Sequence, residues 1–200
     1  MTMTISAEQV KQLRDQTGAG MMECKKALAE SGGDLAKAVD ALRKAGVAQA
    51  EKRSGRAASE GLVDAYIHTG GRVGVLIEVN CETDFVARTD EFAQLARNLA
   101  MQVCAAHAEF VRREDVPGAR VEKEREIYRA QLEGQGKPAA ILDKIVEGKL
   151  GKFYSEVCLL EQPYIKDDSI TVSDLVKQAT AKTGENIVVR RFVRFQLGQE

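Results

Sequence analysis

The sequence has few of the residues from which metal sites and nucleophilic active sites are built. Its 200 residues include two histidines and four cysteines, and the cysteines are scattered without a Cys-x-x-Cys pair. This spacing excludes the common zinc ligand sets, so free thiols in a reducing compartment are the simplest interpretation. Neither histidine has a sequence relation to a cysteine that would indicate a nucleophile with its base.

The sequence also lacks segments that direct or anchor a chain. No run approaches the ~20 apolar residues of a membrane span, and the first residues lack the basic and apolar regions of a signal peptide. There is no phosphate-binding P-loop, and no Gly-x-Gly-x-x-Gly pattern opens a helix. We therefore expect a cytoplasmic protein that is not an enzyme and that needs no cofactor or metal.

Charge of neither sign dominates the chain. The 29 Lys and Arg residues nearly balance 30 Asp and Glu residues, which leaves a formal net charge of −1. No overall field therefore favours nucleic acid or an anionic membrane, and we expect direct binding to neither. A content of 44% hydrophobic and 30% charged residues is typical of a globular chain.

Residues 1–46 have the pattern of three short helices. Apolar residues recur at helical spacing, and glycines follow each run, with Gly46 ending the third helix. Residues 47–60 have no sustained apolar pattern and are typical of a linker. The sequence therefore predicts a small helical domain over residues 1–54.

Two glycine-containing loops of this helical domain resemble those of ubiquitin-associated (UBA-like) domains. They are Thr17-Gly-Ala-Gly-Met-Met22 and Ser31-Gly-Gly-Asp-Leu35. Thioether side chains make adaptable contact surfaces, so we expect Met21, Met22 or both to be exposed for a partner. The alternative is that both plug the core. A bundle this small has little room for an enclosed pocket, which favours a docking unit.

A β-hairpin is predicted next. Apolar residues alternate through its second strand at Val73, Val75, Ile77 and Val79. We expect antiparallel strands at Leu62–Thr69 and Arg72–Cys81, joined by Gly70-Gly71 in a two-residue turn that needs positive φ angles.

The residues after this hairpin are the candidate functional site. Glu82-Thr83-Asp84 ends the apolar alternation, and Phe85 then appears where the chain is expected to turn at the surface. The segment Thr83-Asp84-Phe85-Val86 is therefore the site that the residues themselves indicate. The alternative for Phe85 is a hydrophobic staple onto the following helix near Phe92.

Residues 55–200 are expected to form one core domain around an antiparallel sheet. A long amphipathic helix, Phe92–Ala106, is capped by Thr89 or Asp90 and lies across the buried face of the hairpin. The fold class is therefore α+β, with helices packed on the sheet.

Two further features complete the predicted core. A protruding helical hairpin spans about residues 119–154 and turns at Gly134–Pro138. A last strand covers Asn186–Leu197, in which Ile187, Val189, Val193, Phe195 and Leu197 share a face.

Three long stretches resemble the elongation factor Ts family, and the resemblance covers nearly the full chain. They are Leu13–Leu28, Val75–Val86 and Gly184–Arg191. The resemblance implies a guanine-nucleotide exchange factor for elongation factor Tu, which promotes GDP release by disturbing the Mg²⁺ and phosphate site. In such a protein, the UBA-like module docks on the nucleotide-binding domain of the partner.

The resemblance also implies which residues make these contacts. The intruding segment is Thr83, Asp84, Phe85 and Val86, with Asp84 and Phe85 as the intruding pair. The contacts of the helical module are Arg14, Met21 and Met22. Further candidates are Val73, Gly74 and Gln102, although many relatives carry a histidine where this chain has Gln102.

The family has a long form with a duplicated core, and this chain resembles the short form with a single core. A single core implies a second copy, so we expect a homodimer through the Asn186–Leu197 strand and a 2:2 complex with elongation factor Tu. Two other functions stay open on the residues alone. One is a ubiquitin-like or nascent-chain adaptor built on the helical module, and the other is an RNA-binding accessory factor that uses Arg190, Arg191 and Arg194.

Overall fold

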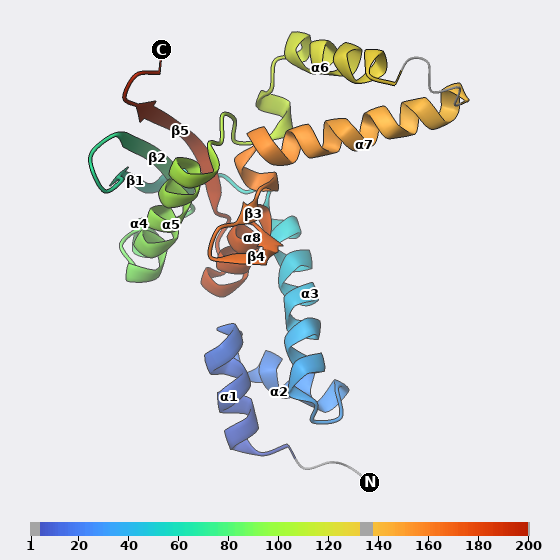
Figure 1. Ribbon diagram of the computed structural model, residues 1–200. Coiled ribbons are helices and arrows are strands. Elements are labelled where there is room, and N and C mark those ends of the chain that lie inside the picture. The colour runs from blue at the N-terminus through green and yellow to red at the C-terminus, as the bar shows by residue number, and fades with distance from the viewer. Residues whose placement is uncertain (1–4, 133–137, 200) are drawn as a thin grey trace. The chain divides into compact units, whose positions relative to one another are not determined.

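The computed structural model describes residues 5–132 and 138–199. It contains helices and strands in an α+β arrangement, as predicted (Figure 1). The chain forms two compact units, each made of three segments. The first is Met1–Gly61, Asn80–Phe92 and Asp174–Val188, and the second is Leu62–Val79, Ala93–Ser173 and Val189–Glu200. The predicted helical domain, residues 1–54, lies within the first unit, and its independence as a domain stays a prediction.

Three helices of the first unit form the predicted bundle. They are α1 (Ala7–Thr17), α2 (Met21–Glu30) and α3 (Leu35–Arg53). Their core consists of small and medium apolar side chains, namely Val10, Leu13, Cys24, Ala27, Leu28 and Ala38. Local caps fix the starts of α1 and α3, because the side chains of Ser6 and Asp34 each accept a backbone N–H three residues later. The UBA-like character of this bundle stays a prediction.

The third helix is longer than predicted, because α3 does not stop at Gly46. It continues to Arg53, so the first half of the predicted linker, residues 47–53, is helical. Alanine-rich residues after Gly46 favour the helix, and Ala50 is buried. A Cβ at Gly46 would lie 3.1 Å from Cβ of Ala181 in α8 (Val172–Thr183), so the glycine permits close packing of the two helices.

Three strands form the main sheet, in the order β1 (Glu60–Ile67), β2 (Val73–Cys81) and β5 (Val188–Gln196). The predicted hairpin is confirmed, but its turn is longer than two residues. The His68 N–H donates to the Val73 carbonyl at 2.9 Å, which leaves a four-residue loop between them. Gly70 and Gly71 have the predicted positive φ angles, 89° and 68°.

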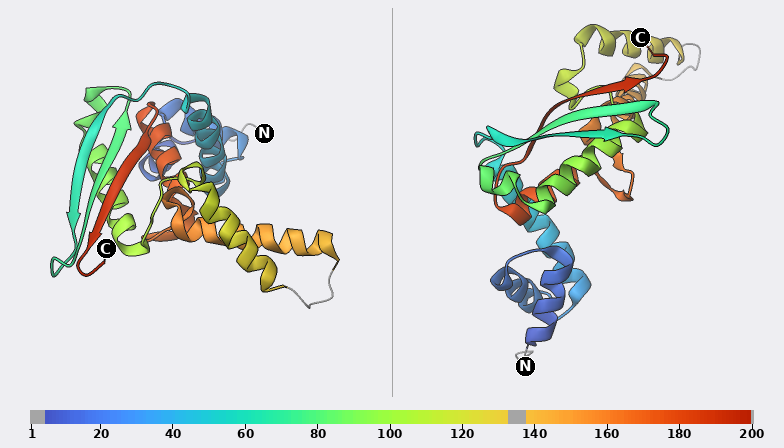
Figure 2. Two further views of the ribbon diagram at one scale, coloured as in Figure 1. Left: turned by 90° about the horizontal axis from the view of Figure 1, so that it is seen from above. Right: turned by 90° about the vertical axis from the view of Figure 1, so that its left-hand side faces the viewer.

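One face of this sheet is covered by α5 (Asp90–Ala106), as Figure 2 shows. The alternating residues Val75, Ile77 and Val79 of β2 are buried, and so is the apolar stripe of α5, which includes Leu95, Leu99 and Val103. The helix starts as predicted, because the Phe92 N–H donates to Oγ1 of Thr89 at 3.2 Å.

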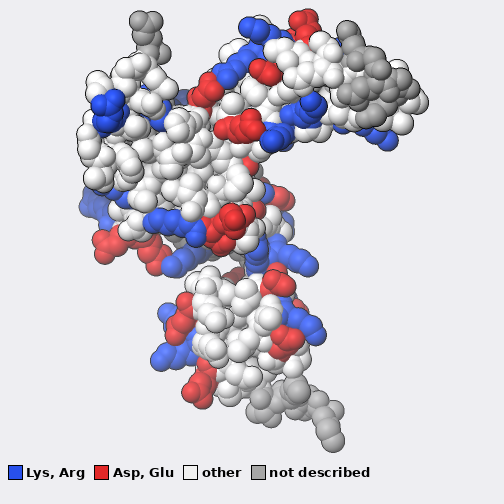
Figure 3. Space-filling model, viewed as in Figure 1, with Lys and Arg blue, Asp and Glu red and all other residues white. Residues whose placement is uncertain are grey.

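The predicted helical hairpin is formed by α6 (Gly118–Ala130) and α7 (Ala139–Val157). The predicted turn, Gly134–Pro138, lies almost entirely outside the described residues. Leu132, Val146 and Leu150 form an apolar cluster in this hairpin. Acidic and basic side chains alternate along the two helices (Figure 3), and the pairs Arg125–Glu147 and Arg129–Asp143 join them.

Short elements link the helical hairpin to the rest of the second unit. They are the 3-10 turns η1 (Arg113–Asp115) and η2 (Leu159–Glu161) and the two-stranded sheet of β3 (Pro163–Tyr164) and β4 (Asp167–Thr171). No helix in the described part of the chain is both long and apolar enough to cross a membrane.

Candidate functional site

The candidate segment forms a single helical turn directly after β2. This turn, α4 (Asp84–Ala87), is capped by Thr83, whose backbone is extended and whose Oγ1 accepts the Val86 N–H at 3.5 Å. The polar residues that end the strand therefore also start the turn.

Phe85 is directed into solvent from this turn. Its side chain is 81% exposed, whereas Phe92 is only 1% exposed. The alternative in which Phe85 staples onto the helix near Phe92 is therefore wrong. Beside it, Oδ2 of Asp84 forms an ion pair with Arg88 Nη2 at 2.9 Å, within the same turn.

A carboxylate from a distant part of the sequence holds the start of this turn. Oε2 of Glu185 accepts the backbone N–H groups of Glu82 at 3.1 Å and of Thr83 at 3.0 Å. Its Oε1 accepts the Thr83 hydroxyl at 2.6 Å. One side chain thus satisfies three donors at the point where the strand becomes the turn.

A return contact runs between the same two segments. The Asn186 N–H donates to Oε1 of Glu82 at 2.7 Å, and Oε2 of Glu82 lies 3.6 Å from Nη1 of Arg56. The Asn186 side-chain amide donates to the backbone carbonyls of Arg56 at 2.7 Å and of Ser54 at 3.4 Å. We call these contacts, together with those of Glu185, the Glu82–Glu185 network. The sequence prediction missed it, although the polar Gly184-Glu185-Asn186 stretch between a helix and a strand was a usable signal.

Cys81 lies next to this network but is not a nucleophile. Burial raises the pKa of its thiol, and the nearby Glu185 carboxylate raises it further. The thiol donates to the Thr83 carbonyl at 3.1 Å. A protonated, buried thiol with this bond supports the backbone and has no reactive role.

The candidate contacts of the helical module lie on its surface. Met21 and Met22 begin α2 and are 48% and 77% exposed, so the alternative that both plug the core is wrong. Arg14 is exposed near the end of α1. The expected exposure of at least one methionine is confirmed, and its contact with a partner stays a prediction.

The three further candidates differ in how far they are accessible. Val73 and Gly74 are half-buried at the start of β2. Gln102 is 0% exposed, and its amide is used internally, donating to Gln162 Oε1 at 3.1 Å and accepting the Ile165 N–H at 2.8 Å. This burial argues against a direct partner contact from Gln102.

The face of the main sheet that α5 leaves uncovered is apolar. Six large side chains are exposed on or directly after its strands: Val63, Ile67, Leu76, Val193, Phe195 and Leu197. The Arg191–Glu78 pair, with 2.7 Å between Nε and Oε2, lies on this same side. We call this surface the outer sheet face. Of the predicted last strand, only the end near Val189 is buried.

The three arginines near the end of the chain do not form one patch. Arg191 pairs with Glu78, and Arg194 donates to the side chains of Gln196 and Gln199. Because successive residues of a strand point to opposite faces, Arg190 and Arg194 lie on the face opposite Arg191. This arrangement does not favour a phosphate-binding surface.

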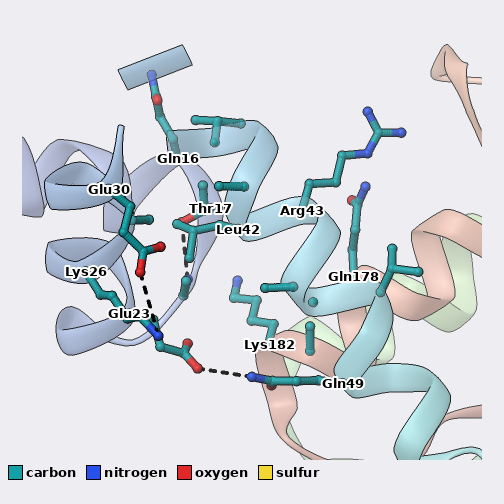
Figure 4. Close-up of a pocket in the computed structure, with 18 residues that line it drawn as sticks. Gln16, Thr17, Glu23, Lys26, Glu30, Leu42, Arg43, Gln49, Gln178 and Lys182 are labelled. Carbon is teal, nitrogen blue, oxygen red and sulfur yellow. Dashed lines mark hydrogen bonds and ion pairs between the residues drawn. The ribbon is translucent and has the colours of Figure 1, made fainter. Parts of the chain in front are cut away.

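A cavity of about 390 Å³ lies in the first unit (Figure 4). Residues of α1, α2, α3 and α8 line it, among them Thr17, Leu42 and Gln178. Two pairs of its polar side chains contact each other, Gln49 with Glu23 at 3.3 Å and Lys26 with Glu30 at 3.8 Å. The lining has neither histidine nor cysteine, and among the described residues no cluster of three or more His, Cys, Asp or Glu could hold a metal ion.

Comparison with known proteins agrees with these observations. A family model described as "Elongation factor TS" matches residues 7–199. Elongation factor Ts of Carboxydothermus hydrogenoformans is 61% identical over 195 residues, which cover 98% of this chain and 90% of that protein. Elongation factor Ts of Coprothermobacter proteolyticus is 62% identical over 197 residues, which cover 98% of this chain and 100% of that protein. The chain therefore belongs to the elongation factor Ts family.

Proposed function

We propose that this protein is a cytoplasmic guanine-nucleotide exchange factor for elongation factor Tu. The observation that carries the proposal is an aromatic side chain, Phe85, held 81% exposed on a capped turn after a rigid hairpin. Burial of so exposed a phenylalanine in a complex is favourable, and the cap holds it outside its own core, so this side chain is the candidate contact with another protein. Relatives named elongation factor Ts, at about 60% identity, supply the partner.

The proposed mechanism is displacement without any covalent step. GDP is held in such GTPases through its phosphates and a Mg²⁺ ion that needs near-ideal octahedral geometry. A small shift of the surrounding elements therefore loosens the metal and the nucleotide together. Insertion of Phe85 between partner helices gains ~1.5–3 kcal/mol of burial free energy, which offsets part of that distortion. Asp84, Thr83 and Val86 enter beside it.

Exchange requires that binding of the two ligands be coupled. Because coupling is reciprocal, a factor that weakens GDP binding binds the nucleotide-free partner more tightly than the GDP-bound one. GTP then rebinds and displaces the factor.

The helical module supplies a second proposed contact. Met21 and Met22 are exposed at the start of α2, and Arg14 is exposed on α1. Thioethers adapt to an uneven apolar surface, and an arginine pairs with acidic groups around it. In this proposal the UBA-like module docks on the nucleotide-binding domain and so brings α4 to its target. Val73 and Gly74 stay as further candidate contacts.

A homodimer completes the proposal, with a 2:2 complex as its consequence. The outer sheet face carries six exposed large apolar side chains, and its charged pair, Glu78 and Arg191, is already neutralised. Two such faces related by a two-fold axis can stack as a sandwich, because each presents the same apolar surface to the other. Two of the six, Val193 and Phe195, lie on β5, and Leu197 follows it directly, so the predicted Asn186–Leu197 segment contributes half of this surface.

The deciding experiment measures release of fluorescently labelled GDP from elongation factor Tu, with and without the wild-type chain. We expect strong acceleration at substoichiometric concentrations of the factor. Both other functions, an adaptor and an RNA-binding factor, predict release at the intrinsic rate. Absence of acceleration would overturn the exchange-factor proposal.

A further inference from the structure

The turn that carries Phe85 is too short to hold itself in place. An isolated helical turn of four residues forms one hydrogen bond for several fixed dihedral angles, which is unfavourable in water. Phe85 adds no packing on its own protein, because it is exposed. The groups that hold its two ends therefore position α4: the contacts of Thr83 at its start, and Thr89 at its end, whose hydroxyl donates to the Val86 carbonyl at 2.8 Å.

Glu185 is the principal anchor. Two backbone N–H groups and one hydroxyl converge on its carboxylate at 2.6–3.1 Å. Hydrogen bonds to a charged acceptor are about twice as strong as those between neutral groups. A carboxylate also suits this position because it has acceptors only, whereas all three groups that face it are donors.

Glu185 also orients the cap of the turn. The Thr83 hydroxyl has one proton, which is directed to Glu185 Oε1 at 2.6 Å. The lone pairs of the same oxygen are then free to accept the Val86 N–H, which lies 3.5 Å away. Without Glu185 the hydroxyl can rotate, and this long capping bond competes with water.

The return contact limits sliding between the two segments. Glu185 accepts from residues 82 and 83, while Glu82 accepts from the Asn186 N–H at 2.7 Å. Carboxylates thus face backbone donors in both directions, so a shift of either segment breaks bonds of the other.

From this geometry we propose that Glu185 is a positioning residue for nucleotide exchange, which fixes the Thr83 cap and thereby the direction in which Asp84 and Phe85 project. This inference rests on the proposed exchange function. Glu185 itself need not touch the partner.

The test compares Glu185→Ala and Glu185→Gln with a matched control, Glu91→Ala. Glu91 pairs with Lys182 at 2.6 Å, so it also joins residues 80–92 to α8, whereas the hydrogen bonds that hold Glu82 and Thr83 come from Glu185 and Asn186. The maximal rate of GDP release and the half-saturating concentration of the factor are measured for each variant. Thermal unfolding of each variant verifies that it is folded.

We expect Glu185→Ala to lower the maximal rate about tenfold, as loss of charge-assisted hydrogen bonds predicts. Glu185→Gln should recover part of this loss. The single amide oxygen of glutamine can take the place of Oε2 and still accept both backbone N–H groups. Glu91→Ala should stay within about twofold of the wild type, as for other exposed ion pairs. A Glu185→Ala rate within twofold of the wild type would overturn the inference, and so would an equal loss in Glu91→Ala.

Amide hydrogen exchange of Thr83 and Val86 separates this inference from the proposed function. Faster exchange of both amides in Glu185→Ala, but not in Glu91→Ala, supports the positioning role. Unchanged exchange overturns it even if the wild type accelerates GDP release. If the wild type does not accelerate release, the exchange function fails, and the role of Glu185 in that function fails with it, whatever the amides show.

Discussion

Two polar networks join distant parts of the sequence, and they differ in charge and in burial. The Glu82–Glu185 network in the first unit is centred on two carboxylates at half-buried positions, with the amide of Asn186 buried beside them. The second unit has a network of neutral amides, in which Gln102 and Gln162 are 0% and 2% exposed. Gln162 also donates to the carbonyls of Ala106 at 3.1 Å and Glu156 at 2.9 Å.

This difference indicates different tasks. A neutral amide has both donors and acceptors, so it can be fully buried and satisfied without the cost of removing a charge from water. The amide network therefore suits the interior, where it holds α5 to the segment around β3. A carboxylate that accepts several hydrogen bonds suits the surface. There it fixes a turn that is too short to be stabilised by its own backbone hydrogen bonds.

The largest effect is expected from Gln102→Leu. This change removes the acceptor of the part-buried Ile165 N–H and the donor to the buried Gln162 Oε1 and to the Pro163 carbonyl, so we expect the free energy of unfolding to fall by about 2–4 kcal/mol. Urea denaturation measures it, and GDP exchange per folded molecule should not change. The control Gln94→Leu, on the exposed side of the same helix, should cost about 0.5 kcal/mol or less. Equal losses of unfolding free energy in both variants would contradict a specific contribution of the amide network to stability.

Phe85→Ala should have the next largest effect, but on exchange and not on stability. Loss of ~1.5–3 kcal/mol of burial in the complex corresponds to a GDP-release rate about 10- to 100-fold lower. The unfolding midpoint should not move, since the side chain is exposed. Ile165→Ala removes another exposed apolar side chain and should leave the exchange rate unchanged. A wild-type rate of GDP release with Phe85→Ala would contradict the role of Phe85 in exchange, and with it the proposed function of the Glu82–Glu185 network.

The outer sheet face differs from both polar networks, because its proposed contacts with a second copy are apolar. Phe195→Glu places a charge in each half of the proposed dimer interface. We therefore expect the dissociation constant of the dimer to rise at least about tenfold. Sedimentation velocity at micromolar concentration measures the change. A wild-type chain that sediments only as a monomer contradicts the dimer, irrespective of the variant.

The smallest effect concerns the ionisation of Cys81. Burial is the main cause of its raised pKa and the Glu185 carboxylate is the second, so Glu185→Gln should lower that pKa slightly. The thiolate then forms at lower pH than in the wild type. Titration of the ¹³Cβ chemical shift detects this, with Cys104 as the control, because burial also raises its pKa but Glu185 does not contribute. An unchanged Cys81 titration would mean that the charge of the network is screened.

Local sequence patterns predicted the elements that local forces determine. The alternation from Val73 to Val79 predicted β2, because a strand with one buried face repeats every second residue. Thr89 predicted the start of α5, because a cap acts on the residues directly after it. The polar residues Glu82–Asp84, which end the apolar alternation, predicted a surface turn because their side chains also act locally.

The failures concern residues whose role depends on a distant neighbour. Gly46 has the local signature of a helix end, but its missing Cβ accommodates Ala181 of α8. Gln102 lies next to Met101 on an amphipathic helix, and its burial depends on partners about 60 residues later. Glu185 receives its donors from more than 100 residues earlier, and no periodicity encodes that pairing.

The capped turn at Thr83 also affects the timing of complex formation. Because Glu185 and Thr83 order α4 when the chain folds, the conformational entropy of this segment is lost before any encounter with a partner. Binding then does not wait for a local folding step. We expect association at the ordinary rate for preformed protein surfaces, about 10⁵–10⁷ M⁻¹s⁻¹, so that each collision in the correct orientation is able to eject nucleotide.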